Sequence, residues 1–353
     1  MIPPSLSLGI GFHGAGALLA ANCYAPQKYL KGWAWEIFWM TQAAWCWLLL
    51  PVIGALLTVP HLQRVLADAP GDRMLYAFLM GIAYGVGGAA FNISIRYIGF
   101  SLTYSIAVGL SSVLGTLVPP LVRGEIGALL QRPGTAWVLS GVAAGAAGIA
   151  ICGVAGRFKE RGLMAATGKR GEFSLSKGLV LSLVAGVLSA VYGMALEVAA
   201  PVADVAEKYG AGIWKGNVSY LFVNTGAFLT SLLYSADLAR RNGTFKQLLR
   251  LHEGRGERRI ASNYIFAFLT GVLWYGQFFF YNLGHVRLGT QYAFSSWAIH
   301  MILLVLLSNL TALIFREWKD CSLGTRLIIG AGIVVLCAAV VMLTYGNRLG
   351  EVS

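Results

Sequence analysis

Ten long apolar stretches, five on each side of a basic segment at residues 157–177, restrict the folds open to this chain more than any other feature. Each stretch has about 20 residues, the length that an α-helix needs to cross the ~30 Å hydrocarbon layer of a bilayer. The sequence therefore predicts a membrane protein with ten transmembrane segments. These segments cover residues 5–24, 35–57, 74–94, 102–121, 134–154, 178–198, 217–235, 261–281, 291–315 and 323–345.

The ten segments are predicted to be helices. None alternates apolar and polar residues along its length as a transmembrane β-strand does, and only helices and closed barrels satisfy every backbone hydrogen bond in lipid. Hydrophobic residues make up 57% of the chain and charged residues only 12%, about half the charged fraction of a soluble domain. We therefore expect an all-α polytopic membrane protein and exclude a soluble one.

The formal net charge of +12 is concentrated in alternate connections between the segments. With Arg326, at the start of the tenth segment, assigned to the ninth connection, the five odd-numbered connections hold 2, 1, 6, 7 and 3 Lys and Arg residues, which is 19 of the 27 in the chain. Cytoplasmic connections of membrane proteins are enriched in Lys and Arg, so these five are predicted to lie inside and both termini outside. We attribute the basic charge to topology and to anionic lipid headgroups, not to nucleic acid.

The segments form two groups of five, and an odd number per group means that the second group enters the membrane from the opposite side. This is the inverted-repeat arrangement of many secondary transporters. We predict two inverted five-helix repeats at 1–156 and 178–353, joined by a basic central loop at 157–177. Two weak internal matches occur in the same order in both groups: Gly16-Ala-Leu-Leu-Ala20 with Gly186-Val-Leu-Ser-Ala190, and Tyr97-Ile-Gly99-Phe-Ser-Leu-Thr-Tyr104-Ser105 with Leu288-Gly289-Thr-Gln-Tyr-Ala-Phe294-Ser295.

Few ionisable residues lie inside the predicted segments, where a charge is costly and usually faces a cavity or a partner. His13 is near the middle of the first segment, His300 is well inside the ninth, and Glu36 is at the start of the second. Histidine titrates near neutral pH, and desolvation moves a glutamate toward the same range. We predict that His13, Glu36 and His300 couple transport to a proton. A packing role for the histidines and a headgroup position for Glu36 are the alternatives.

Three predicted helix faces combine aromatic rings with amide, hydroxyl and imidazole groups. Aromatic rings can cover the C–H surface of a sugar while amide and imidazole groups bind its hydroxyls. The faces therefore predict a small polyhydroxylated ligand, with an aromatic belt at the membrane interface as the alternative. Residues about four apart share a helix face, and the three sets are Trp35, Trp39, Gln42 and Cys46; Trp274, Gln277, Tyr281 and His285; and Tyr292, Ser296 and His300 with Trp297 alongside.

The chain lacks the sequence signatures of metal sites and of catalysis. It contains no HExxH motif, GxSxG elbow or phosphate-binding loop, which are the motifs of common hydrolases and nucleotide enzymes. Its five cysteines follow no metal-binding spacing. We expect no metal, no cofactor and no enzymatic activity.

Distinctive short blocks follow one another along nearly the whole chain: His13-Gly-Ala, Tyr24-Ala-Pro-Gln-Lys28, Trp33-Ala-Trp-Glu36, Arg96-Tyr-Ile-Gly99, Lys177-Gly-Leu-Val180, Trp274-Tyr-Gly-Gln-Phe-Phe-Phe-Tyr281, Gly284-His285, Gln291-Tyr292, Trp297, His300-Met301 and Glu317-Trp318. In these blocks the chain resembles the L-rhamnose/proton symporters of bacteria, within the drug/metabolite transporter superfamily. The resemblance implies ten helices, a location in the bacterial inner membrane and proton-driven uptake of L-rhamnose or a related deoxysugar.

The chain departs from the pattern of that family at two places. Residues 87–92 read Gly-Gly-Ala-Ala-Phe-Asn where the family tends to have a pair of asparagines. Ala293 follows Gln291-Tyr292 where a carboxylate is common in the family. Both departures remove polar groups, so they leave the substrate and the coupling chemistry open.

We therefore predict a sugar/proton importer that works by alternating access, with an exporter or exchanger of another metabolite as the first alternative. An intramembrane enzyme and a sugar sensor that binds without transport are weaker alternatives, because neither catalytic motifs nor a soluble signalling domain is present. The predicted partners are sugar, protons and membrane lipids, and the sequence specifies no oligomeric state. The predicted sugar contacts are Trp35, Trp39, Trp274, Gln277, Tyr281, Gln291, Tyr292 and Trp297.

Overall fold

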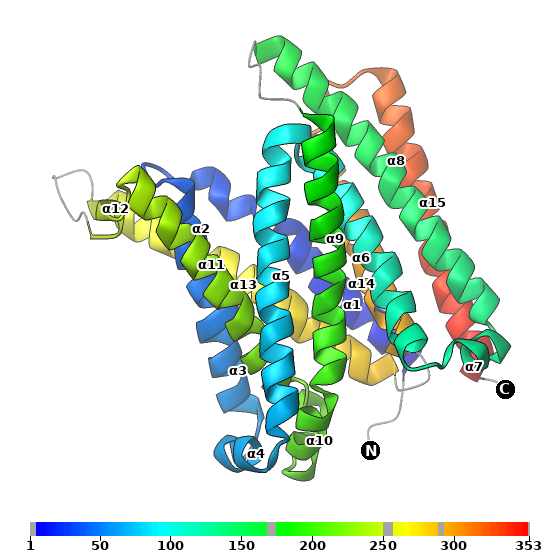
Figure 1. The fold of residues 1–353 in the computed structure, drawn as a ribbon. Coiled ribbons are helices and arrows are strands. Elements are labelled where there is room, and N and C mark those ends of the chain that lie inside the picture. Colours follow the sequence, from blue (N-terminus) through cyan, green and yellow to red (C-terminus); the bar gives the residue numbers. More distant parts are fainter. Residues whose placement is uncertain (1–4, 168–173, 250–256, 289–292, 352–353) are drawn as a thin grey trace. The chain divides into compact units, whose positions relative to one another are not determined.

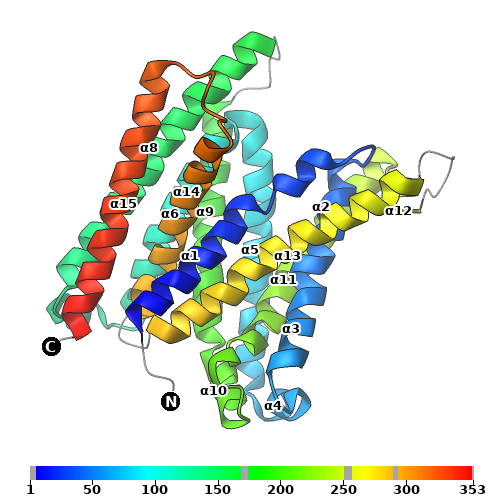
Figure 2. The same cartoon turned by 180° about the vertical axis from the view of Figure 1, so that it is seen from behind.

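The computed structural model describes residues 5–167, 174–249, 257–288 and 293–351. Every regular element within these ranges is a helix, as Figures 1 and 2 show from two sides. The prediction of an all-α protein is confirmed for the described part of the chain.

The chain divides into two compact units by its internal packing. Unit 1 comprises Asn22–Val86 and Ala195–Asn282, and unit 2 comprises Ile2–Ala21, Gly87–Met194 and Leu283–Ser353. Each unit contains segments from both predicted repeats, so this division neither supports nor opposes the repeats at 1–156 and 178–353. The inverted-repeat arrangement stays a prediction.

Unit 1 contains helices η1 Ala25–Tyr29, α2 Trp35–Ala43, η2 Ala44–Leu49, α3 Leu50–Thr58, α4 Leu62–Asp68, α10 Ala200–Lys208, η3 Gly212–Trp214, α11 Asn217–Asn242 and α12 Lys246–Leu249. Unit 2 contains nearly all of α1 Leu6–Asn22, together with α6 Phe100–Val122, α7 Ile126–Gln131, α8 Thr135–Thr167, α14 Ala293–Ile314 and α15 Leu323–Glu351. Three long helices contribute to both units, because the division falls inside them: α5 Gly71–Ile98, α9 Leu175–Val198 and α13 Glu257–Leu288.

Nine helical stretches in the described residues are long and apolar enough to cross a bilayer. They coincide with nine of the ten predicted segments. The remaining segment, 217–235, lies in α11, which has 26 residues but is not among the nine, because polar residues such as Asn217 and Asn224 lower its hydropathy. Its crossing of the membrane therefore stays a prediction.

The surface of these helices is apolar at many positions. Leu57 is 80% exposed, and Val122 and Ile314 are each 78% exposed. Exposed apolar residues in such numbers indicate a surface that contacts something other than water. Together with the helix lengths, they identify a multi-pass integral membrane protein.

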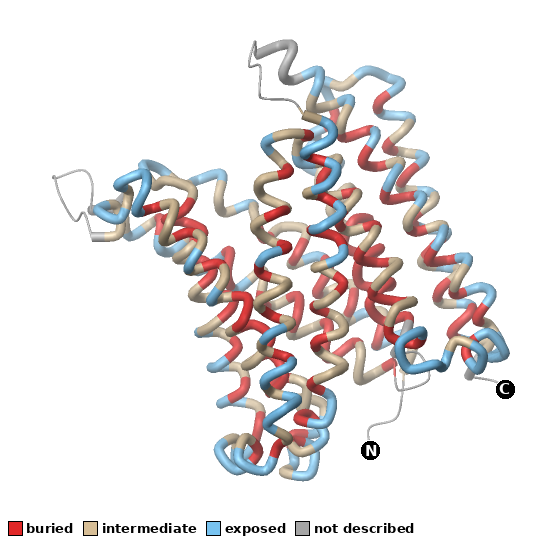
Figure 3. Tube along the Cα trace, in the orientation of Figure 1, coloured by how far each residue is buried: buried red, intermediate tan, exposed pale blue. Residues whose placement is uncertain are grey.

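Close packing in unit 2 depends on glycine. Helix α15 packs along α8, and the two lie side by side in both views (Figures 1 and 2). A Cβ atom added at Gly141 or Gly148 of α8 would lie 2.9 Å from the side chain of Leu343 or Leu336. Small residues allow membrane helices to approach closely, and buried positions recur along these helices in Figure 3.

The predicted basic loop at 157–177 is shorter in the structure, because α8 continues to Thr167 and α9 begins at Leu175. Two charged side chains on this last part of α8 bind neighbouring helix ends. Arg157 Nη1 donates to the carbonyl oxygen of Ile98 at 3.0 Å, and the Ser101 amide donates to Glu160 Oε1 at 2.8 Å. These contacts satisfy backbone groups that helix ends leave without partners.

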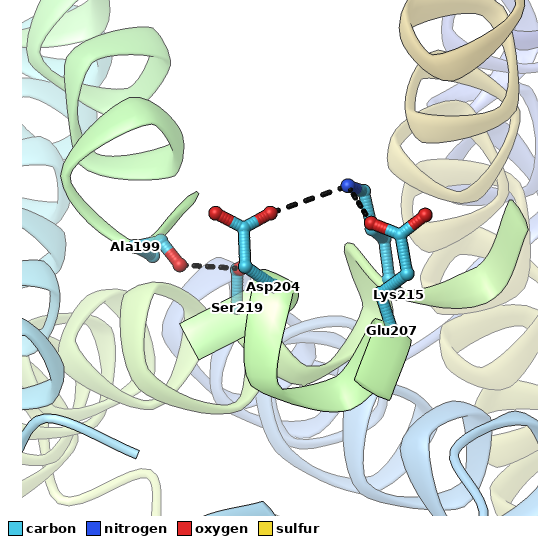
Figure 4. Close-up of polar contacts among 5 residues, drawn as sticks. All are labelled: Ala199, Asp204, Glu207, Lys215 and Ser219. Carbon is cyan, nitrogen blue, oxygen red and sulfur yellow. Dashed lines mark hydrogen bonds and ion pairs between the residues drawn. The ribbon is translucent and has the colours of Figure 1, made fainter. Parts of the chain in front are cut away.

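In unit 1, a charged cluster supports the connection that follows α9 (Figure 4). The Lys215 ammonium lies 3.2 Å from Asp204 Oδ1 and 2.5 Å from Glu207 Oε2. Burial of the lysine opposes its charge, but the hydrogen bonds to Glu207 and Asp204 outweigh that effect and raise its pKa. Ser219 Oγ also donates to the Ala199 carbonyl at 3.5 Å.

Candidate functional site

A tryptophan cluster, formed by Trp35, Trp39, Trp47 and Trp274, occupies part of unit 1. Trp35 stacks on Trp39 with ring centroids 5.2 Å apart and planes inclined by 18°. The Trp274 ring of α13 lies edge-on to Trp39 at 5.7 Å and to Trp47 at 5.5 Å. Tyr24 completes the group, with its ring 5.3 Å from that of Trp274. The structure thus brings together three predicted sugar contacts, Trp35, Trp39 and Trp274.

Sequence reasoning did not identify Trp47 as part of this group. In a regular α-helix, 3.6 residues per turn would place Trp47 about 80° around the axis from Trp39. The structure instead has a π-helical turn, η2, at Ala44–Leu49. A π turn has more residues per turn than an α-helix and often marks a functional site. It changes the direction of Trp47, whose ring lies 5.5 Å from that of Trp274, and nothing in the sequence indicated it.

Gln42 is a polar residue in the last turn of α2, two residues before the π turn. Its side chain is fully buried, and neither amide atom has a hydrogen-bond partner in the described part of the chain. Helix α13 passes close by, because a Cβ atom added at Gly271 would lie 2.6 Å from Trp45 Cβ and 3.4 Å from the Gln42 backbone oxygen. The sequence placed Gln42 on the face of Trp39 but did not assign it to the site.

Two other predicted sugar contacts follow Trp274 on α13. Gln277 and Tyr281 are three and seven residues further along, so they fall near the same helix face. Each is only 7% exposed. Both side chains are therefore buried, and their contact with sugar stays a prediction.

Glu36 lies in the first turn of α2 and is buried in unit 1. Its Oε1 atom accepts hydrogen bonds from Asn242 Nδ2 at 3.0 Å and from Thr244 Oγ1 at 2.8 Å. A carboxylate near a helix N-terminus is also favoured by the helix dipole. The side chain therefore joins the start of α2 to the end of α11, and it binds protein groups instead of facing outward.

His13 and His300 lie next to each other in unit 2. Both imidazoles are buried, with 0% and 1% exposure, and their ring centroids are 5.7 Å apart with planes inclined by 63°. His13 Nε2 is 3.0 Å from Ser296 Oγ, one turn before His300 on α14. The predicted pair of proton-coupling histidines is thus in contact, and Ser296 joins it.

Gly284 sets the position of the His13 ring. A Cβ atom added at this residue of α13 would lie 2.9 Å from both Cδ2 and Nε2 of His13 and 3.0 Å from the Gly9 carbonyl oxygen. Any larger residue would push the imidazole or the α1 backbone away. Gly284 was part of a recognised sequence block, but its role in placing His13 becomes visible only in the structure.

Trp297 is buried in unit 2. Its indole N–H donates to the backbone oxygen of Ser111 at 3.1 Å and to Ser111 Oγ at 3.2 Å. A Cβ atom added at Gly193 would lie 3.2 Å from its ring. Because its polar atom is bonded inside the unit, any contact of Trp297 with sugar involves the ring face, and that contact stays a prediction.

Two predicted sugar contacts, Gln291 and Tyr292, lie outside the described residues. Asn92, next to the departure from the family pattern in α5, donates its amide to the Gly88 carbonyl of the same helix at 2.9 Å. Within the described chain, no group of three or more His, Cys, Asp or Glu side chains is arranged to hold a metal ion.

The arrangement provides two kinds of chemistry. The tryptophan cluster offers flat apolar surfaces beside buried amides, which suits a ligand with C–H faces and hydroxyl groups. The histidine pair offers buried groups that change charge near neutral pH in solution. Neither feature alone specifies a ligand.

Comparison with known proteins gives one consistent result. A family model described as L-rhamnose-proton symport protein matches residues 2–347. A protein of Mannheimia succiniciproducens named L-rhamnose-proton symporter is 33% identical over 348 residues, which cover 97% of this chain and 99% of that protein. Proteins of the same name from Pectobacterium atrosepticum and Yersinia pestis are each 34% identical, over 95% and 96% of this chain and 96% and 97% of their own lengths.

Proposed function

The chain belongs to the L-rhamnose-proton symport protein family, and from that membership we propose that it imports L-rhamnose, or a related deoxysugar, together with protons across the bacterial inner membrane. The observation that carries the proposal is the match over residues 2–347. The family is one of transporters, so the prediction that the chain is not an enzyme is confirmed.

The proposed sugar site centres on the tryptophan cluster of unit 1. Trp35, Trp39 and Trp274 supply ring surfaces, and Gln277 and Tyr281 follow on the buried face of α13. Aromatic rings bury the C–H surface of a pyranose and its methyl group, while polar side chains fix its orientation. We include Gln291, Tyr292 and Trp297 as further proposed contacts from the sequence.

The proposed proton-coupling residues are His13, His300 and Glu36. The contact between the two imidazoles supports a coupled pair, because a charge on one ring opposes a charge on the other. Glu36 provides a second way to couple a proton to the structure, because its protonation would weaken the hydrogen bonds that its Oε1 accepts from Asn242 and Thr244. A proton at these residues would thus change local contacts in either unit.

The proposed mechanism is alternating access, in which protonation favours the outward-facing, sugar-loaded state. Linkage requires that protonation and sugar binding strengthen each other by the same factor. We also propose ten crossings in two inverted five-helix repeats, periplasmic termini and membership of the drug/metabolite transporter superfamily. The distribution of Lys and Arg and the odd number of segments per repeat support the topology.

Sugar-driven proton movement tests the function directly. L-Rhamnose added to proteoliposomes with no pre-formed gradient should cause proton entry, seen as alkalinisation of a weakly buffered medium. Protein-free liposomes and addition of a sugar alcohol serve as controls. Sugar entry without any proton movement would contradict symport.

An exporter or exchanger of another metabolite is the second candidate. Ala293 favours it, because this residue stands where a carboxylate is common among the symporters that the chain resembles. A competition series, in which unlabelled sugars and other metabolites compete with labelled L-rhamnose, distinguishes the two. Competition by deoxysugars alone supports the importer, and stronger competition by another class supports the second candidate.

A further inference from the structure

We propose that the side-chain amide of Gln42 binds a hydroxyl group of the transported sugar and contributes to the selection among sugars. This role rests on the proposed function, but three polar groups in unit 1 support it independently of the family match, because they are buried and have no hydrogen-bond partners among the described residues.

Gln42 is an exception to a strong rule of protein interiors. Its side chain is 0% exposed, yet both its Oε1 and its Nε2 atoms have no hydrogen-bond partner among the described residues. Buried polar groups are almost always paired, because an unpaired one loses its hydration without compensation. A buried amide with neither end bonded is therefore a group that a ligand can satisfy.

Two more polar groups close to Gln42 share this property. Thr270 of α13 is fully buried, and its hydroxyl lacks a partner in the described chain, as does the indole N–H of Trp274 one turn further on. Threonine in a helix often donates to the carbonyl four residues earlier, and no such bond is formed here. The three groups belong to the two helices that meet at Gly271.

The packing at Gly271 explains how these groups come together. A Cβ atom at this residue would lie 2.6 Å from Trp45 Cβ and 3.2 Å from the Cys46 backbone nitrogen, so α13 packs against the residues three and four positions after Gln42. Trp39 lies three residues before Gln42 on α2, and its ring lies edge-on to Trp274 at 5.7 Å. The amide thus belongs to the same contact region as the rings of the tryptophan cluster.

The chemistry of this group matches a sugar. A carboxamide offers one acceptor and two donors, so it can accept from one hydroxyl and donate to its neighbour. The threonine hydroxyl and the indole N–H add further donors, and none of the three carries a charge. A neutral polyol fits this set better than an ionic metabolite, whose charge would lack a buried partner.

The first test is calorimetric titration of L-rhamnose into the purified protein. Gln42→Leu removes both hydrogen-bonding ends at similar size and should weaken binding about tenfold to a hundredfold, the range for loss of a buried hydrogen bond. Thr41→Val is the matched control, because the Thr41 hydroxyl already donates to the Ile37 carbonyl at 2.8 Å. The control should bind L-rhamnose as the wild type does.

Singly deoxygenated analogues of L-rhamnose sharpen this test. The wild type should lose affinity for the analogue that lacks the hydroxyl bound by Gln42, whereas Gln42→Leu should bind that analogue and L-rhamnose equally. Thermal unfolding without sugar adds a second readout. Gln42→Leu should unfold at the same or a higher temperature than the wild type, because the substitution removes an unsatisfied polar group. If Gln42→Leu does not fold, Gln42→Met is used in the titrations in its place.

The outcomes separate the two proposals. If the wild type binds L-rhamnose and the Gln42 variants bind it equally, with unchanged responses to every deoxy analogue, the role of Gln42 is overturned and the function stands. If the wild type binds neither L-rhamnose nor related deoxysugars, the proposed function is overturned and the role of Gln42 falls with it.

Discussion

His13 and Ser296 are hydrogen-bonded in the buried interior of unit 2, with the histidine Nε2 atom 3.0 Å from the serine Oγ atom. His300 lies one turn beyond Ser296 with its ring 5.7 Å from that of His13. The Ser296 hydroxyl can donate to Nε2 or accept from it, according to the tautomer of His13, so it can stay bonded to the ring when the histidine gains or loses a proton.

Ser296→Ala should therefore impair coupling more than sugar binding. Loss of one buried hydrogen bond is worth about 1–2 kcal/mol, so proton-driven uptake should fall roughly five- to thirtyfold, while the Kd for L-rhamnose stays within about twofold of the wild type. Ser296→Thr, which keeps the hydroxyl, should restore most of the uptake. Uptake by both variants at the wild-type rate over the full pH range would show that the hydroxyl has no part in coupling.

Gly284→Ala should displace the His13 ring and destabilise the protein. The added Cβ would lie 2.9 Å from two ring atoms of His13, and overpacking of this kind costs about 1–3 kcal/mol. Gly330→Ala is the control, because no atom lies within 4 Å of the Cβ position there. Thermal unfolding should show a lower Tm for Gly284→Ala and an unchanged or higher Tm for Gly330→Ala, and equal Tm values would contradict the packing described for His13.

Trp39 and Trp274 should contribute to sugar binding through their ring surfaces. Trp274→Ala removes the ring that lies edge-on to Trp39 and Trp47, and loss of a buried aromatic contact surface should weaken L-rhamnose binding by about tenfold or more. Trp274→Phe keeps part of the surface and should bind with intermediate affinity. Equal Kd values for all three proteins, measured by calorimetry, would remove Trp274 from the site.

Glu36→Gln should separate the uptake of a proton by this residue from the hydrogen bonds that it accepts. The amide oxygen can still accept from Asn242 and Thr244, which bind Glu36 Oε1 in the wild type, but the residue can no longer take up a proton. We expect the variant to exchange sugar across vesicle membranes and to fail at uphill accumulation. Accumulation equal to that of the wild type would contradict a role of Glu36 in coupling and would leave it only the structural role of joining α2 to the end of α11. In that case Glu36→Ala, which loses both hydrogen bonds, should lower the Tm.

Lys215 gives a pH-dependent contribution to stability outside the predicted spans. Its pKa in the folded protein is raised above the ordinary 10.5 by Glu207 and Asp204, so its contribution is complete below that ordinary value and is lost as pH rises through the folded pKa. The side chains are partly exposed, so the contribution is at most about 1 kcal/mol. The Tm difference between wild type and Lys215→Met should therefore stay constant from neutral pH to roughly pH 9.5 and shrink at higher pH. A difference that grows at higher pH would contradict a raised pKa of Lys215 in the folded protein.

Much of the fold follows from the sequence, because apolar length alone determines where a helix can cross a membrane. The predicted segment 35–57 matches α2, η2 and α3 to within one residue, since together they run from Trp35 to Thr58. The π turn inside them was not predictable, because it depends on how α2 and η2 pack against α11 and α13. The short helices α4, α7 and α10 were also missed, since none is long enough for an apolar stretch to reveal it.

The residues of the candidate site were likewise predictable only in part. His13 and His300 were found because an ionisable group in a membrane segment is conspicuous, and Trp39 and Trp274 because aromatic residues share helix faces with amides. Gln42 needed the structure, since only the lack of hydrogen-bond partners distinguishes it from a bonded core amide. Ser296 resembles many serines of membrane helices, and its contact with a histidine of α1, distant in sequence, is visible only in three dimensions.

The most direct test of proton-coupled sugar import is the accumulation of labelled L-rhamnose by sealed proteoliposomes with an inward proton gradient. We predict that the internal concentration rises above the external one, that an uncoupler abolishes the excess, and that His13→Gln vesicles reach only equal concentrations. Uptake that never exceeds equilibrium in correctly inserted wild-type protein, with or without the gradient, would contradict proton-coupled import.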